Sequence, residues 1–257
     1  MIKQVENKDE ISFDLLVANC CGRRIISYLN AYGTDYDFCK FYKSGNSIIL
    51  IINSTMLICG NDFEADELNM FVGMHNPFRI EGNQIALGMI DNKGYMQLHR
   101  TTFELVSGEH DIEESDVNLN PRLVDVYAIL TEGFPNLSDY PLWLADTSHR
   151  VRHGISRVLT YKDCTTATLS YDINGHVLVS QVATKISARG SGYARKFLTW
   201  LAEYLNKQGK TAVLYALDIR ESFYREIGFK VVSEEFVLEK TEYTDEIITK
   251  GKLQYND

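Results

Sequence analysis

SARGSGYARKF, residues 187–197, places two glycines one residue apart between a predicted strand and a predicted helix. The strand covers 176–184 and is joined to 165–171 across Asn174-Gly175, which is a strong hairpin signal. After the glycines, apolar residues recur with the spacing of one helix face, namely Ala194, Phe197, Leu198, Leu201 and Leu205. The glycines therefore lie at a strand-to-helix turn.

Bare backbone at such a turn is typical of an anion-binding site. The first N–H groups of a helix lack internal partners, and the helix dipole favours negative charge there. We therefore expect a ligand that carries phosphate. A P-loop is excluded because the chain has no G-x-x-x-x-G-K-[ST] run. A dinucleotide-binding fingerprint would need glycine or alanine at the position of Arg195, although Asp218 fits the acidic residue that the fingerprint expects after the next strand. A nicotinamide-dependent enzyme is therefore kept only as a third alternative.

The second half of the chain is predicted to be mixed in structure, with helices before and after a strand meander. The expected helices cover 121–131, 141–155, a segment ending near Gly209, and 220–227. The expected strands cover 157–161, 165–171, 176–184, 211–217 and 229–238. The glycine loop therefore connects a strand to a helix that is followed by a parallel strand.

This order resembles the GNAT superfamily of acyl-CoA-dependent N-acyltransferases over residues 111–238. The loop Arg189-Gly190-Ser191-Gly192-Tyr193-Ala194 matches the family's pyrophosphate-binding loop, and Phe223-Tyr224 with Gly228-Phe229 matches its F-Y-x-x-x-G-F segment. The resemblance implies an α+β fold with a GNAT-like mixed, mostly antiparallel sheet flanked by helices. It also implies acetyl-CoA as co-substrate and a small-molecule or peptide amine as acceptor.

The resemblance assigns roles residue by residue. The backbone N–H groups of the loop would hold the pyrophosphate of CoA, from Arg189, Gly190 and Ser191 through Gly192, Tyr193 and Ala194, with the Arg189 side chain adding charge. The strand before it would bond pantetheine through the main chain of Val182, Ala183 and Thr184. Acetyl-CoA would then lie in a V-shaped opening between that strand and 211–217. Tyr224 would protonate the departing thiolate as general acid.

Departures from the family pattern keep a second hypothesis open. The first position of the loop pattern is Ser187 rather than Gln or Arg, and Leu217 stands where the family often has asparagine. Gln181 occupies the strand that usually offers a general base, so the base is unassigned; water or a residue from 132–153 could serve. Tyr224 could also be a packed aromatic. The alternative is therefore a catalytically silent acyl-CoA-binding sensor or scaffold.

The first half of the chain has a similar order of elements. One or two helices are expected over 11–29, then a small antiparallel meander and a helix over 62–72 with Asn61 or Asp62 as N-cap. A strand pair over 84–90 and 95–105 is expected to flank a hairpin turn at 91–94. This half can be read as a degenerate GNAT-like copy. Because carboxylates crowd 62–67, it is not expected to bind CoA, and it would shape the acceptor cleft or a homodimer interface.

Length, charge and cysteine usage complete the prediction. The 257 residues and an acidic stretch over 107–120 suggest two domains, 1–108 and 109–257. A net charge of -9 argues against a nucleic-acid binder. Five cysteines without repeated C-x-x-C spacing suggest reduced thiols, and no segment reads as a signal peptide or membrane span, so we expect a cytoplasmic protein. His149 and His153 have the i, i+4 spacing of metal ligands but no nearby Glu, and no metal is expected.

Overall fold

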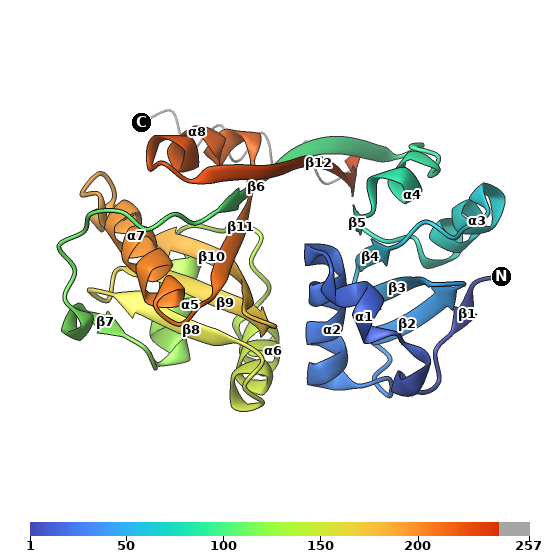
Figure 1. The fold of residues 1–257 in the computed structure, drawn as a ribbon, viewed down its shortest axis with the longest axis horizontal. Coiled ribbons are helices and arrows are strands. Elements are labelled where there is room, and N and C mark those ends of the chain that lie inside the picture. The colour runs from blue at the N-terminus through green and yellow to red at the C-terminus, as the bar shows by residue number, and fades with distance from the viewer. Residues whose placement is uncertain (242–257) are drawn as a thin grey trace. The chain divides into compact units, whose positions relative to one another are not determined.

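A computed structural model describes residues 1–241 of the chain (Figure 1). The chain divides into two compact units, one formed by Met1–Arg100 with the segment that begins at Glu235, the other by Thr101–Glu234. The two consecutive domains that the sequence suggested differ from this division, because the end of the last strand groups with the first unit. Residues 242–257 of the expected second domain lie outside the described residues. Within residues 1–241, every helix is too short or too polar to cross a bilayer.

The second unit, Thr101–Glu234, is built from two helices, a meander of strands, a long helix, a strand and a short helix. Its helices are α5 (Leu123–Thr131), α6 (Tyr140–Arg152), α7 (Tyr193–Asn206) and α8 (Asp218–Glu226). Its strands are β7 (Val117–Asn118), β8 (Arg157–Tyr161), β9 (Thr165–Ile173), β10 (His176–Thr184) and β11 (Thr211–Leu217). Two strands, β6 (Tyr95–Glu104) and β12 (Lys230–Lys240), contribute residues to both units.

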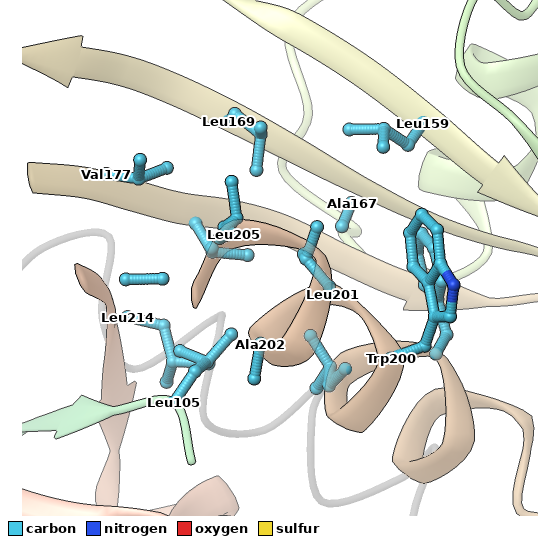
Figure 2. Close-up of a cluster of buried hydrophobic side chains, with 14 of the residues drawn as sticks. Leu105, Leu159, Ala167, Leu169, Val177, Trp200, Leu201, Ala202, Leu205 and Leu214 are labelled. Carbon is cyan, nitrogen blue, oxygen red and sulfur yellow. The ribbon is translucent and has the colours of Figure 1, made fainter. Parts of the chain in front are cut away.

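The sheet of the second unit runs in the order β6-β11-β10-β9-β8-β7. Strands β7 to β10 are antiparallel neighbours, whereas β10 and β11 are parallel because α7 connects them. Figure 2 shows the apolar face of α7, with Leu201 and Leu205, turned toward strand residues such as Leu169 and Val177. This face is the one that the helical spacing of the sequence predicted.

The first unit repeats this order of elements. Its helices are α1 (Phe13–Val17), α2 (Cys20–Tyr32), α3 (Ala65–His75) and α4 (Gln84–Gly88). Its strands are β1 (Lys3–Gln4), β2 (Cys39–Ser44), β3 (Ser47–Ile52), β4 (Thr55–Cys59) and β5 (Arg79–Gly82). They run β1-β2-β3-β4-β5-β12, with β4 and β5 parallel. Two helices, a three-strand meander, a loop, a helix and a parallel strand thus occur in each unit, and the predicted mixed, mostly antiparallel α+β class is confirmed.

Two local predictions for the first unit are wrong. Residues 84–88 form helix α4 instead of a strand, because the side chain of Asn83 accepts the N–H groups of Ile85 and Ala86 and so caps a helix. Helix α3 begins after Glu64 rather than after Asn61 or Asp62. The carboxylate of Asp62 instead accepts the N–H of Asn46, which ties this loop to the preceding hairpin.

Candidate functional site

Strands β10 and β11 are paired at one end and unpaired at the other. Their register runs over four positions, from His176↔Thr211 to Val179↔Leu214. Beyond these pairs, β10 continues to Thr184 and β11 to Leu217 without further pairing to each other. This is the arrangement that a V-shaped opening requires, since one backbone edge of each strand is released from the ladder.

A bulge in β10 lies at the start of this opening. The register against β9 shifts between Ser180 and Ala183, and Gln181 adopts a φ of 49°. The amide oxygen of Gln181 accepts a hydrogen bond from the Thr168 hydroxyl at 2.9 Å. Beyond the bulge, Val182 packs against the core under α7, whereas Ala183 belongs to the apolar cluster of α5 and α6. The three strand residues expected at the cofactor, Val182 to Thr184, therefore all lie on the part of β10 that pairs with β9 but no longer with β11.

The glycine loop follows directly and is exposed. Gly190 and Gly192 have φ angles of 77° and 74°, a region that L side chains rarely adopt. A Cβ atom added at either glycine would meet no atom of residues 1–241 within 4 Å. Gly192 is the N-cap of α7 and offers no side-chain cap, and the first turn of α7 carries no acidic residue. The first N–H groups of this helix are thus open to an anion.

Two residues fix the loop to the end of α5. The carboxylate of Glu132 accepts the N–H of Ile186 at 2.5 Å. The guanidinium of Arg189 donates to the carbonyl oxygens of Glu132 at 2.5 Å and of Thr184 at 3.2 Å. Arg189 was predicted to add charge to the cofactor, and here its side chain also holds the shape of the loop. Glu132, one of the residues open as a general base, has its carboxylate on the loop backbone.

Tyr224 lies on α8 in a cluster of aromatic rings. Its ring stacks on Phe229, with a centroid distance of 6.2 Å, and contacts Phe103 and Phe223. The side chain is only 5 % exposed. Burial raises the pKa of Tyr224 above its usual value, and the positive charge of Arg220 opposes that rise. The phenol is therefore protonated at neutral pH, as a proton donor must be.

The structure also shows which residues the sequence reasoning missed near the site. Lys162, in the turn between β8 and β9, places its Nζ 5.8 Å from the ring centroid of Tyr193 at the start of α7. Arg220, on the first turn of α8, donates to the carbonyl of Gly133 at 3.2 Å. These contacts join parts of the chain that have no shared periodicity, so the sequence carries no signal for them. The rings of His149 and His153 lie with their centroids 4.1 Å apart and are tilted by 31°, and the Nδ1 atom of His153 hydrogen-bonds the His149 carbonyl.

Solved structures with this arrangement of elements were found by comparison. An acetyltransferase of the GNAT family from Colwellia psychrerythraea has a TM-score of 0.56 and 14% identity, with 93% of this chain and 99% of that chain covered. A GCN5-related N-acetyltransferase from Sphaerobacter thermophilus has a TM-score of 0.59 and 14% identity, covering 93% and 95%. A GCN5-related N-acetyltransferase-like protein from Streptococcus suis has a TM-score of 0.54 and 17% identity, covering 88% and 96%.

The likeness extends over both units, because 93% of this chain is more than either unit contains. No family profile and no curated protein matches the sequence. At these identities the likeness establishes the fold, and the chain has the GNAT fold.

Proposed function

Because the chain has the GNAT fold, we propose that it is an acetyl-CoA-dependent N-acyltransferase that acts on a primary amine. One observation carries this proposal: the unpaired end of β10 runs directly into a loop whose two left-handed glycines precede an uncapped, acid-free helix N-terminus. An extended chain with a pyrophosphate at one end suits this arrangement, because the strand edge offers backbone bonds and the helix offers N–H groups to an anion.

The proposal gives roles to the chain's own residues. The backbone from Arg189 to Ala194 binds the pyrophosphate, and the open space around Gly190 and Gly192 accepts its oxygens. The free edge of β10 from Val182 to Thr184 orients the pantetheine part by main-chain hydrogen bonds. Acetyl-CoA, when bound, supplies an acyl group activated as a thioester.

The proposed reaction needs one proton donor at the leaving sulfur. The neutral amine nitrogen attacks the thioester carbonyl, the N–C bond forms and the C–S bond breaks. The thiolate takes the phenolic proton of Tyr224, while the nitrogen loses a proton to water and the phenolate regains one from solvent. A tyrosine with its ordinary pKa is already protonated at neutral pH, and the rise in the pKa of Tyr224 that burial causes leaves it so. The products are an amide and the free thiol of CoA.

The burial of Tyr224 favours a second candidate function. A phenol that is 5 % exposed and in contact with three phenylalanine rings has the contacts of a core residue. The alternative is a catalytically silent acyl-CoA-binding sensor or scaffold. It predicts binding without turnover.

Location and assembly are part of the proposal. All five cysteines are free thiols, and Cys39 and Cys59 are buried. Reduced thiols are the usual state in the cytoplasm, where we place the protein. A homodimer stays a prediction, and the mass in solution by light scattering tests it.

Calorimetric titration with acetyl-CoA tests the cofactor site. The protein is compared with a Gly190→Asp, Gly192→Asp variant and with a Gly190→Asn, Gly192→Asn control that imposes the same backbone constraint without charge. We expect saturable binding by the wild type, loss of binding in the aspartate variant and partial binding in the asparagine control. No binding by folded wild-type protein would contradict the proposal.

Tyr224→Phe then separates the two candidate functions. Release of the CoA thiol is measured with a panel of primary amines. For an enzyme we expect Tyr224→Phe to lower kcat by at least about 100-fold with unchanged acetyl-CoA affinity. Binding without thiol release by the wild type on any amine would favour the silent sensor.

A further inference from the structure

Arg220 connects the two sides of the opening between β10 and β11. It lies on the first turn of α8, directly after β11. Its guanidinium donates to the carbonyl oxygen of Gly133 at 3.2 Å and lies 5.4 Å from the ring centroid of Phe134. Both of these partners follow α5 in the chain, so the side chain reaches from one wall of the opening to the other.

Gly133 and Phe134 are held against the unpaired end of β10. A Cβ atom built on Gly133 would lie 2.9 Å from the Cβ of Ala183. Phe134 packs on the same apolar cluster to which Ala183 belongs. The guanidinium of Arg220 is therefore fixed where β10 and β11 have separated. It lies beside the loop between α5 and α6, at that end of the opening.

The charge of Arg220 has no counter-ion in the part of the chain that the structure describes. Within residues 1–241, no carboxylate oxygen lies within 4.0 Å of its guanidinium, whereas Arg225 on the same helix pairs with Glu221 at 2.5 Å. Arg220 is half-buried, and one of its five N–H donors goes to Gly133. A planar guanidinium with free donors fits a carboxylate in a bidentate manner.

We propose that Arg220 binds a carboxylate of the acceptor, so that the substrate is a small amine with a carboxylate a few bonds away, as in an amino acid. This inference rests on the proposed function and names the substrate class. The cation would repel polyamines and aminoglycosides, whose further amines are also positive. The protein has a net charge of -9, which disfavours an acceptor with a negative group. The local positive charge of Arg220 would select such an acceptor in spite of it.

Matched acceptors test the assignment on the full-length protein. The probes are α-amino acids, each compared with its own primary carboxamide, which removes the negative charge. Rates are expressed per neutral amine, because the carboxylate also raises the pKa of the α-amino group. With acetyl-CoA present, thiol release by the wild type is expected to favour the acid over the amide by at least about tenfold in kcat/KM. In Arg220→Gln this ratio should fall to about one, while Arg225→Gln, on the same helix, keeps it.

A binding measurement separates failure of this inference from failure of the proposed function. Calorimetry of the same probes with protein saturated with CoA reports carboxylate recognition without turnover. Preference for the acid that is lost in Arg220→Gln, without thiol release from any amine, would support the inference and remove the enzyme assignment. Thiol release with equal use of acids and amides, or an unchanged ratio in Arg220→Gln, would overturn the inference and leave the proposed function standing.

Discussion

The two units repeat one order of elements, yet their parallel strand pairs end differently. In the second unit, β10 and β11 pair from His176↔Thr211 to Val179↔Leu214, and both strands then continue without pairing to each other, while β10 stays paired with β9. In the first unit, β4 and β5 pair from Thr55↔Arg79 to Ile58↔Gly82, and β5 ends at that last pair. The N–H of Asn83 still bonds the Ile58 carbonyl at 2.8 Å. The same topology is thus open in one unit and closed in the other.

The helices after these strands differ in the same sense. Helix α7 begins at Gly192 with no acidic residue in its first turn. Helix α3 begins after Glu64 and carries Asp66 and Glu67 in its first turn. The carboxylate of Glu67 accepts the N–H of Ile2 at 2.6 Å and lies 3.5 Å from the amino group of Met1. An anion site therefore needs more than the topology: it needs a helix end that the chain leaves without carboxylates.

The closed strand pair of the first unit carries a buried charge cluster. Glu81 on β5 bonds Arg24 at 2.5 Å and also pairs with Arg100 and Arg79. Burial opposes ionisation of Glu81, but the three guanidinium groups outweigh it and hold its pKa well below the usual range. We expect this cluster to be structural, because each carboxylate charge has a cationic partner.

The largest effect is expected for Glu81→Gln. Arg100 keeps Glu235 and Arg79 keeps Glu239 as partners, but loss of the Glu81 carboxylate removes the buried charge that all three arginines share. This loss should cost about 3–5 kcal/mol of the free energy of unfolding. Denaturant unfolding at pH 7 measures the loss. Glu226→Gln is the control, since Glu226 pairs with Arg195 at 3.8 Å in an exposed ion pair, and it should change stability by less than about 1 kcal/mol.

The stability of wild type and Glu81→Gln can also be compared as a function of pH. Because the folded pKa of Glu81 is lowered, its stabilising contribution is present above its unfolded pKa and is lost as the pH falls through the folded value. The difference in stability between wild type and Glu81→Gln should therefore be constant from pH 7 to about 5 and shrink in acid. A difference that shrinks already between pH 7 and 6 would contradict the cluster's role.

Gly82→Ala is expected to lower the free energy of unfolding by about 3 kcal/mol. The alanine would have to adopt the φ of 138° that Gly82 has, and its Cβ would lie 1.9 Å from the Ile58 carbonyl oxygen. Its matched variant in the open unit is Gly190→Ala, where φ is also positive but the Cβ meets nothing within 4 Å. That change should cost about 1 kcal/mol. Denaturant unfolding of both variants gives the comparison, and equal losses would mean that closure of the first unit does not depend on this close approach.

Transferring the acidic pattern of α3 to α7 tests the comparison at the helix ends. Ala194→Asp with Arg195→Glu places carboxylates at the positions that Asp66 and Glu67 hold in α3. We expect acetyl-CoA affinity to fall at least about tenfold, while the unfolding free energy rises by about 0.3–1 kcal/mol, since anions stabilise a helix N-terminus. Ala194→Asn with Arg195→Gln is the neutral control in both measurements. Unchanged acetyl-CoA affinity in the acidic variant would mean that the N-terminus of α7 takes no part in cofactor binding.

The second unit was predicted more closely than the first, for local reasons. Strands β8, β10 and β11 have the expected bounds. For β10 the reason is local, because Asn174-Gly175 and the glycine loop mark its two ends in the sequence itself. Helix α4 was missed because five residues are too short to show helical periodicity. Its start depends on one Asn83 side chain.

Contacts between residues far apart in the chain limit how much of the site could be predicted from the sequence. The glycine loop is a local motif and could be found in the sequence. In contrast, Arg220 and Gly133 are separated by 87 residues, and Glu132 and Ile186 by 54. Each pair is brought together by the packing of helices on the sheet, and nothing in the sequence around either residue indicates the other. The grouping of the end of β12 with the first unit has the same cause, since Leu238 pairs with Ile80.

Glu132→Gln is expected to have the smallest effect. Like the carboxylate of Glu67 in the first turn of α3, the Glu132 carboxylate accepts a backbone N–H. It bonds the N–H of Ile186, however, which precedes the glycine loop, and it is not part of α7. Gln keeps an oxygen acceptor and removes the charge, so stability should change by less than about 1 kcal/mol. Acetyl-CoA should bind about two- to threefold more tightly at low salt, and the gain should vanish near 1 M salt, where charges are screened within about 3 Å. Calorimetry at the two salt concentrations measures this, and a gain that persists at high salt would show that the change acts through loop shape instead of charge.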